Sequence, residues 1–326
     1  MLVHFFVVAL FLFAAKLSRV GGQSDHAEPK EGNFRLRNGV EMPLVGFGTA
    51  GLGDGEQLAP LYAILKGFRH IDTAQATEWY NEAAIAQSVD ECGMPREKLF
   101  LVTKVHPRYF GYERTLRSFN HSLAALRTSY VDLLLLHTSD CSDWTGLCEK
   151  DSSRGTFFDA WRALESLYHK GQVKAIGVSN FNVEQLEALS STAVVPIHVV
   201  QNHMDPFKQD REVRAWCQAR GVLYTGYSTL GTQWRPPGGQ NPVLNHPVIQ
   251  TLAQRHGVSP ALLVLVWARQ EGVAVIPRSS EAKHIDELAR LLPKAKDRVQ
   301  VVLSEDEMKQ MQALDGVDGS NLRDEL

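Results

Sequence analysis

Eight short apolar runs, each followed by a longer amphipathic stretch, organise the sequence between residues 45 and 290. The runs are rich in Val, Ile and Leu and do not alternate strictly between apolar and polar residues, which is typical of strands buried on both faces. Eight strand–helix units predict an α/β fold, a (β/α)8 TIM barrel, rather than an open sheet. The predicted strands span residues 45–49, 70–73, 100–105, 131–137, 173–179, 194–201, 222–228 and 273–279.

The glycines near the first predicted strand argue against a Rossmann domain. Gly51, Gly53 and Gly55 are close to that strand, but no Gly-x-Gly-x-x-Gly opens a helix after it. The dinucleotide fingerprint requires that spacing. Before the first strand, residues 34–44 are typical of a β-hairpin that turns at Asn38-Gly39. We expect this hairpin to cover the floor of the barrel.

The first residues are typical of a targeting segment and not of the fold. Residues 5–15 form an unbroken apolar run, which is too short to cross a bilayer, since a spanning helix needs about 20 apolar residues. Small residues follow Lys16 and Arg19, so we predict a signal peptide over residues 1–22, cleaved after Gly22. An uncleaved amphipathic anchor is the alternative.

The last four residues, Arg323 to Leu326, resemble the Lys-Asp-Glu-Leu type of retrieval signal, which a receptor reads and which is not an anchor. Together with the signal peptide, this tail predicts the lumen of the endoplasmic reticulum, a KDEL-type retrieval receptor as a partner, and no membrane insertion after cleavage. The predicted divisions are an extension over residues 23–33, the barrel over 34–318 and the tail over 319–326.

Charge and cysteine usage exclude some classes of function. Removing residues 1–22 takes away Lys16 and Arg19, so the formal charge moves from −3 to −5, and no basic stripe remains to bind nucleic acid. No cysteine cluster has the spacing of zinc ligands, so we expect no metal site. Cys141 and Cys148 form either a disulfide, which an oxidising lumen permits, or two free thiols. Asn120 opens a candidate glycosylation sequon.

Polar residues follow the predicted strands at their C-terminal ends, where the active site of a barrel forms. Several of them are ionisable or can donate hydrogen bonds, and residues at consecutive strand ends converge on one cavity. In chain order they are Asp72, Lys104, His137, Ser179-Asn180, Gln201, Tyr227-Ser228 and Arg278-Ser279.

The motifs around these residues resemble those of the aldo-keto reductases. The stretch from Gly67 to Ala74, followed by Tyr80-Asn81-Glu82, is similar to the first signature of that family. Further matching motifs occupy residues 102–104, 130–133, 174–181 and 276–279, in order and at the family's spacing. The resemblance runs from about residue 34 to residue 315. It implies an NADPH-dependent enzyme that reduces a small carbonyl substrate, an aldehyde or ketone, and a monomer as the family's usual state.

The resemblance also implies a catalytic tetrad of Asp72, Tyr80, Lys104 and His137. A tyrosine titrates near pH 10 and is a poor acid at neutral pH. The ammonium of Lys104 would favour the phenolate and so lower the pKa of Tyr80 toward use. Asp72 would keep the buried lysine charged, and His137 would orient the carbonyl and help to stabilise the developing oxyanion.

The remaining site residues are implied in the same way. Ser179, Asn180 and Gln201 would bind the nicotinamide carboxamide, and Tyr227 would stack on the ring. Arg278 and Ser279 would bind the 2′-phosphate, which favours NADPH over NADH. The further expected cofactor contacts are Ser228, Leu230 and His284, and the expected substrate contacts are Trp79, Thr138, Trp144 and Trp234.

The chain departs from the family at the proton donor. Seven residues separate Asp72 from Tyr80, where the family usually has four, and Tyr80 directly precedes Asn81, where the family has one residue between them. If Asn81 sets the register, Trp79 occupies the tyrosine's place and the protein is an NADP(H)-binding pseudoenzyme that acts as a sensor or scaffold. Counted from Asp72 to Asn81, the chain has two more residues than the family. If these two residues reshape the loop, Tyr80 occupies the position of the family's tyrosine; we favour this hypothesis.

Other departures concern specificity. Thr138 follows His137 where many members have Trp, so the resemblance does not identify which aldehyde or ketone is the substrate. His284 replaces an Arg and Leu288 an Asn among the adenosine contacts, so NADH remains an alternative to NADPH.

Overall fold

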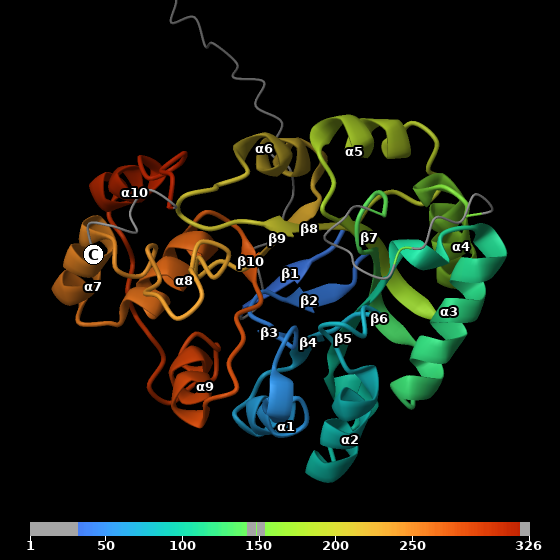
Figure 1. The fold of residues 1–326 in the computed structure, drawn as a ribbon, viewed down its shortest axis with the longest axis horizontal. Helices are drawn as coiled ribbons and strands as arrows, with labels where there is room; N and C mark the ends of the chain where they lie inside the picture. Colours follow the sequence, from blue (N-terminus) through green and yellow to red (C-terminus); the bar gives the residue numbers. More distant parts are fainter. Residues whose placement is uncertain (1–31, 142–147, 149–153, 320–326) are drawn as a thin grey trace, which may run out of the picture.

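The computed structural model describes residues 32–141, 148 and 154–319. The predicted signal peptide, the retrieval signal and Trp144 lie outside these residues. Within them, eight parallel strands curl around one axis in sequence order, which confirms the predicted α/β barrel (Figure 1). The strands are β3 (Phe47–Gly48), β4 (His70–Asp72), β5 (Phe100–Val105), β6 (Val131–Leu136), β7 (Val173–Ser179), β8 (Val199–His203), β9 (Leu223–Tyr227) and β10 (Ala274–Val275).

The first and last strands meet and close the ring. A parallel bridge pairs Val45 with Val275, and the N–H of Gly46 donates to the carbonyl of Val275 at 2.8 Å. Seven of the eight predicted strands contain one of these elements, and the eighth, 194–201, overlaps β8, which continues to His203. β3 and β10 are shorter than predicted, and β8 begins at Val199 instead of Val194, after Pro196, which has no N–H to donate to a ladder.

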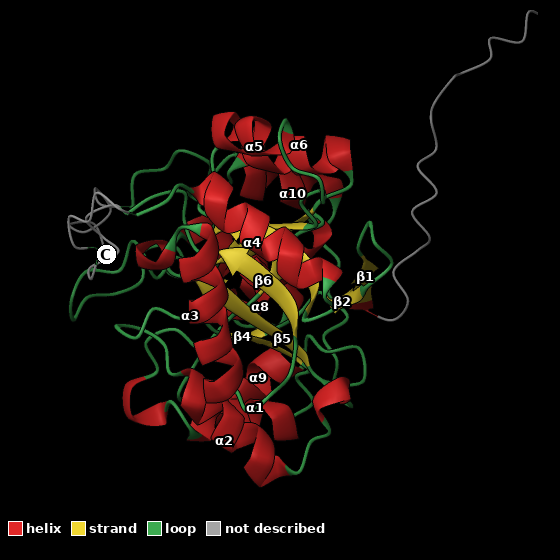
Figure 2. Cartoon of the chain, turned by 90° about the vertical axis from the view of Figure 1, so that its right-hand side faces the viewer, coloured by secondary structure: helices red, strands yellow, loops and turns green. Residues whose placement is uncertain are grey.

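Helices cover the outside of the strand ring, as Figures 1 and 2 show. None of the helices in the described part of the chain has the length and apolar character of a membrane span. They are α1 (Leu58–Leu65), α2 (Glu82–Cys92), α3 (Tyr112–Ala125), α4 (Phe157–His169), α5 (Val183–Ser190), α6 (Arg211–Arg220), α7 (Pro247–His256), α8 (Pro260–Gln270), α9 (Ala282–Ala289) and α10 (Glu305–Gln312), with short 3-10 turns η2 (Gly53–Gly55), η3 (Arg96–Lys98) and η4 (Pro107–Tyr109).

The apolar core has two parts, because strand side chains point alternately inward and outward. The outer part lies between strands and helices and includes the buried rings of Trp161 and Trp267. The inner part fills the barrel with side chains such as Val102, Leu133 and Leu135. The barrel is therefore packed through its lower half and leaves room only at its mouth.

The N-terminal hairpin covers the floor of the barrel, as predicted. It consists of β1 (Asn33–Arg35) and β2 (Glu41–Pro43), which pair antiparallel. Met42 is fully buried in the inner core, and the amide of Asn38 donates to the carbonyl of Lys174 at 2.8 Å. Figure 2 shows the hairpin at one end of the strands, so access to the interior is from the other end.

Candidate active site

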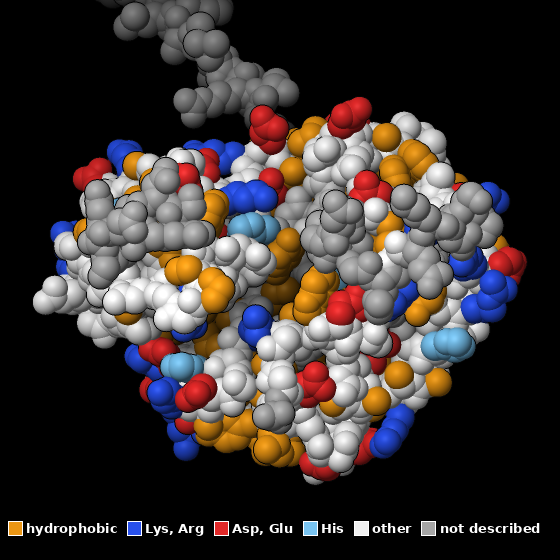
Figure 3. All heavy atoms as spheres, in the orientation of Figure 1, with side chains coloured by type: hydrophobic (Ala, Val, Ile, Leu, Met, Phe, Trp, Pro, Cys, Tyr) orange, Lys and Arg blue, Asp and Glu red, His pale blue; other side chains and the backbone are white. Residues whose placement is uncertain are grey.

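A cavity of about 1260 Å³ opens at the C-terminal ends of the strands. Figure 3 shows a hollow in this face, with apolar side chains inside it and basic side chains at its edge. Loops after seven of the strands contribute to its lining. The tetrad residues Asp72, Tyr80 and His137 are among the lining residues, and Lys104 lies buried beneath them.

Lys104 and Asp72 form a buried ion pair at the base of the cavity. The Lys104 ammonium donates to the Asp72 carboxylate at 2.5 Å and to the carbonyl of Thr73 at 3.0 Å. Burial lowers the pKa of Lys104, but Asp72 and Tyr80 together raise it by more, so the pKa lies above the ordinary 10.5. Lys104 is therefore charged at neutral pH.

Tyr80 lies against this ammonium. The Lys104 nitrogen is 5.0 Å from the centroid of the Tyr80 ring, and the rings of Tyr80 and His137 meet edge to face with centroids 5.9 Å apart. The tyrosine is half-buried and lines the cavity. Burial raises the pKa of Tyr80, and the ammonium of Lys104 offsets only part of that effect, so the pKa lies above its ordinary value and not below it, contrary to the prediction.

The loop before Tyr80 resolves the question of register. The N–H groups of Trp79 and Tyr80 both donate to the carbonyl of Ala76, at 3.0 and 2.9 Å. This turn takes up the extra residues, and it brings Tyr80, and not Trp79, to Lys104 and His137. Trp79 lines the cavity with 38% of its surface exposed.

His137 directly follows β6 and is buried at the cavity wall. Burial, and to a lesser extent the charge of Lys104, hold the pKa of His137 well below the ordinary 6.5. The imidazole is therefore neutral at physiological pH and able to donate one N–H. Its backbone carbonyl accepts from the amide of Asn180 at 2.8 Å, which joins His137 to the next strand.

All four residues predicted to hold the nicotinamide are linked by hydrogen bonds to the tetrad or to one another. The Tyr227 hydroxyl donates to the Asn180 amide oxygen at 2.6 Å, and the amide of Gln201 donates to Asp72 at 2.9 Å. The fourth, Ser179, accepts from Asn180 at 3.2 Å. Asn180 has φ of 59°, in the left-handed region, which turns its side chain toward these partners. Ser228 and Leu230 follow Tyr227 in the lining.

The residues predicted to bind the 2′-phosphate lie at the edge of the cavity. Arg278 is exposed, lines the cavity and donates to the carbonyl of Gly51 at 2.9 Å. Ser279 and His284 lie outside the lining, and their side chains are 3.3 Å apart. Leu288 is buried in the core, which removes it from any cofactor contact. A cation at the edge and amides beside Tyr227 at the centre fit a phosphorylated nicotinamide dinucleotide.

The predicted substrate contacts divide into three groups. Trp79 and Thr138 line the cavity. Trp234 does not, contrary to prediction, because its indole N–H donates to Asp205 at 2.8 Å and its ring packs against Phe207. Trp144 lies outside the described residues. Of the two alternatives for Cys141 and Cys148, the disulfide is confirmed. Cys141 directly follows Ser139 and Asp140, which line the cavity.

Sequence reasoning missed the residues that hold the Tyr80 loop, chiefly Gln75, Glu78 and His106. Gln75 is buried and donates to Ser122 at 3.0 Å, while Glu78 contacts His106 at 3.2 Å. The inserted residues were the signal, since an added loop segment needs contacts of its own.

Ser122 belongs to the candidate glycosylation sequon; it is buried, whereas Asn120 is exposed on α3. No three His, Cys, Asp or Glu side chains in the described ranges are placed to hold a metal ion.

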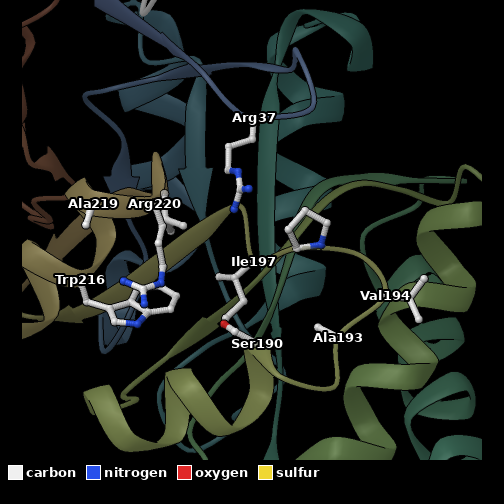
Figure 4. Close-up of a pocket in the computed structure, with 10 residues that line it drawn as sticks. Arg37, Ser190, Ala193, Val194, Ile197, Trp216, Ala219 and Arg220 are labelled. Atoms are coloured by element: carbon white, nitrogen blue, oxygen red, sulfur yellow. The ribbon is translucent and has the colours of Figure 1, made fainter. Parts of the chain in front are cut away.

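A second hollow, of about 510 Å³, lies near the floor of the barrel (Figure 4). Arg37 from the hairpin turn and Arg220 from α6 reach it from two sides. Arg220 is paired with Glu187 at 2.6 Å and lies over the Trp216 ring. None of the predicted catalytic or cofactor residues lines this hollow, so the chemistry belongs to the cavity at the strand ends.

Comparisons with known proteins point to one family. The sequence profile described as the aldo/keto reductase family matches residues 44–315. The chain is 36% identical over 282 residues to the glyoxal reductase of Bacillus subtilis (strain 168), covering 86% of this chain and 91% of that protein. It is 36% identical over 254 residues to the 9,11-endoperoxide prostaglandin H2 reductase of Trypanosoma cruzi (strain CL Brener), covering 77% and 83%. The solved structure of a Bombyx mori aldo-keto reductase in complex with NADP is similar, with 25% identity, a TM-score of 0.76, and 90% and 96% coverage.

Proposed function

The chain belongs to the aldo/keto reductase family, and from that premise we propose that it is an NADPH-dependent reductase of aldehydes or ketones. The observation that carries this proposal is the position of Tyr80, between the Lys104 ammonium and the His137 ring at the base of the cavity. A carbonyl oxygen placed there meets a proton donor and a neutral hydrogen-bond donor together. This position of Tyr80 supports a reductase over the alternative of an NADP(H)-binding pseudoenzyme.

In this mechanism the chain's residues manage a proton and a developing negative charge. When bound, NADPH supplies the hydride. Tyr80 gives its phenolic proton to the carbonyl oxygen as the oxygen becomes an alkoxide. Lys104 stabilises the phenolate that remains, and Asp72 keeps Lys104 charged in its buried position. His137, neutral because of its lowered pKa, donates to the carbonyl oxygen and orients it.

Cofactor preference rests on the edge of the cavity. Arg278 presents a guanidinium that suits the 2′-phosphate of NADPH, since planar guanidinium groups bind phosphate well. Ser279 and His284, next to it, are the second and third candidate contacts. At the centre, Ser179, Asn180 and Gln201 would bind the carboxamide, Tyr227 would stack on the ring, and Ser228 and Leu230 would flank it.

The substrate is proposed as an aldehyde or ketone of modest size. Trp79 and Thr138 lie on the wall of the cavity near the tetrad and would contact it. The relatives named above act on different compounds, so a substrate panel should include glyoxal alongside larger aldehydes and ketones.

We also propose that the protein works in the lumen of the endoplasmic reticulum. The apolar run at residues 5–15 and the tail Arg323 to Leu326 support this location, and the Cys141–Cys148 disulfide suits an oxidising compartment. Deleting the last four residues should cause secretion of a tagged protein that is otherwise retained. Secretion of both forms alike would refute a role of the tail in retrieval.

The first test of the reductase is a fluorescence titration with NADPH and with NADH, followed by an assay at 340 nm over the carbonyl panel. Binding of NADPH with turnover is the expected result. Binding without turnover of any carbonyl would contradict catalysis, and failure to bind either cofactor would contradict the proposal as a whole.

A further inference from the structure

We propose that Glu78 is the positioning residue for Tyr80, and that it holds the lengthened loop through His106 and Arg108. This inference rests on the proposed reductase function, in which Tyr80 is the proton donor. Glu78 lies two residues before Tyr80, within the stretch that is longer than in the family. It does not line the cavity, so its effect on the reaction must pass through the loop that carries Tyr80.

Glu78 contacts the segment that directly follows β5, the strand that carries Lys104. One carboxylate oxygen lies 3.2 Å from the Nε2 of His106, and the other lies 3.6 Å from a guanidinium nitrogen of Arg108. His106 follows β5 directly, two residues after Lys104, and Arg108 lies in η4. The carboxylate therefore ties the Tyr80 loop to the backbone segment whose lysine must contact Tyr80.

The contact with His106 has a defined direction. The backbone N–H of Arg108 donates to the Nδ1 of His106 at 3.1 Å, so Nδ1 is an acceptor. A neutral imidazole then carries its proton on Nε2, the atom that faces Glu78. The hydrogen bond thus runs from His106 to a carboxylate, which is a charge-assisted contact and stronger than a neutral one. The imidazole is 1% exposed, so its position is set by packing.

The rest of the loop makes Tyr80 sensitive to this anchor. Gln75 fixes the start of the loop, because its N–H donates to the carbonyl of Lys104 at 3.1 Å and its side chain enters the interior. Trp79 is held on the other side, where its carbonyl accepts from the N–H of Gly51 at 2.6 Å. Glu78 is the charged anchor between them. Without it, the turn from Ala76 to Tyr80 loses its charged contact with the segment after β5, and the phenol can move away from Lys104.

The experiment compares Glu78→Ala and Glu78→Gln with Thr77→Ala, an exposed neighbour in the same turn. Glu78→Ala should lower kcat about 10- to 100-fold, since a misplacement of about 1 Å can cost that much, while the Kd for NADPH changes less than about twofold. Glu78→Gln keeps an amide oxygen that accepts from His106 but loses the charge that faces Arg108, so it should recover part of kcat. Thr77→Ala should match the wild type.

A second readout does not depend on turnover. Amide hydrogen exchange of a peptide spanning residues 73–81 should be faster in Glu78→Ala than in Thr77→Ala, and intermediate in Glu78→Gln. Unchanged kcat and unchanged exchange in Glu78→Ala would overturn the inference. Equal losses in the Ala and Gln variants would also overturn it, since the proposed hydrogen bond survives in Gln. A wild type that binds NADPH without turnover would refute the proposed reductase instead, and the exchange data would still decide the positioning role.

Discussion

The rings of Tyr80 and His137 meet edge to face, with their planes inclined by 70°. Both side chains therefore border the same part of the cavity, one as a proton donor and the other as a neutral hydrogen-bond donor. A carbonyl oxygen can contact both at once, so the two residues define the point at which reduction should occur.

Replacing Tyr80 by Phe should abolish turnover and leave NADPH binding unchanged. The loss should be about 10² to 10⁴-fold in kcat, the usual contribution of a general acid. Trp79→Phe is the matched control, because Trp79 precedes Tyr80 in the same turn and lines the cavity. It should alter the KM for the carbonyl more than kcat. A larger kcat loss in Trp79→Phe than in Tyr80→Phe would mean that the indole occupies the donor position after all.

Replacing Asp72 by Asn should deprive Lys104 of its charge. Burial then acts on Lys104 with less opposition, so the pKa of Lys104 falls and that of Tyr80 rises further. We expect kcat to drop by about 10²-fold and the free energy of unfolding to fall by about 3 kcal/mol, the scale for breaking a buried ion pair. Kinetics and thermal unfolding measure the two effects. In a Lys104→Met background, Asp72→Asn should cost little more in kcat; full additivity would contradict a role of Asp72 through Lys104.

The rate of carbonyl reduction should be independent of pH across the neutral range. Tyr80 and Lys104 have pKa values above 10.0 and 10.5, so both are protonated there, and His137 is neutral because its pKa lies well below 6.5. Reduction should decline only as pH rises through the pKa of Tyr80, because the proton donor is then lost. Oxidation of the alcohol should show the opposite slope. A pH series of kcat in both directions checks this, and an inflection of the reduction rate near 6.5 would contradict a neutral His137.

The preference for NADPH should depend on Arg278 and improve on changing His284. Arg278→Met should weaken NADPH binding by about 10-fold or more, the scale for losing a charge-assisted contact, and should leave NADH binding nearly unchanged. His284→Arg should tighten NADPH, because His284 is exposed beside Ser279 and a permanent cation there adds attraction for a phosphate. Fluorescence titrations of the wild type and both variants give the Kd values for NADPH and for NADH. Parallel loss of NADPH and NADH affinity in Arg278→Met would show that Arg278 does not bind the 2′-phosphate.

Removing the disulfide should affect the substrate more than the cofactor. The bridge follows Ser139 and Asp140, which line the cavity, while the cofactor residues lie on other strands. Replacing Cys141 and Cys148 together by Ser should raise the KM for the carbonyl, leave the Kd for NADPH unchanged and lower stability by about 2 kcal/mol. Dithiothreitol should reproduce the effect in the wild type and in Cys92→Ser. Cys92 is a free thiol, so a reductant effect lost in Cys92→Ser would assign it to that residue.

The barrel and the convergence of the tetrad were predictable, because buried parallel strands have a distinctive composition and their C-terminal ends share one face. The strand bounds were less so. Val194 to His198 look like a strand in sequence, but the ladder begins at Val199. Local composition reports burial, and pairing with neighbours decides where a ladder starts.

The details of the site depended on contacts distant in sequence. The loop before Tyr80 contacts Gly51, His106 and Arg108, which lie outside the loop and which no local pattern of the loop reveals. Trp234 was expected at the cavity and packs on Phe207 instead, since a tryptophan in a loop has two ways to bury its ring. The raised pKa of Tyr80 follows from the extent of burial, a property of the assembled site.

The hydrogen bond between Asp72 and Gln201 crosses the barrel. Asp72 ends β4 and Gln201 lies in β8, and these strands occupy opposite sides of the ring of eight. Their contact therefore spans the diameter of the mouth at the level of the reacting groups. Because the width there is fixed by side chains within the barrel, the loops above can gain residues without spreading the strand ends. The longer segment before Tyr80 is therefore compatible with the contacts that Asp72 makes with Lys104 and Gln201.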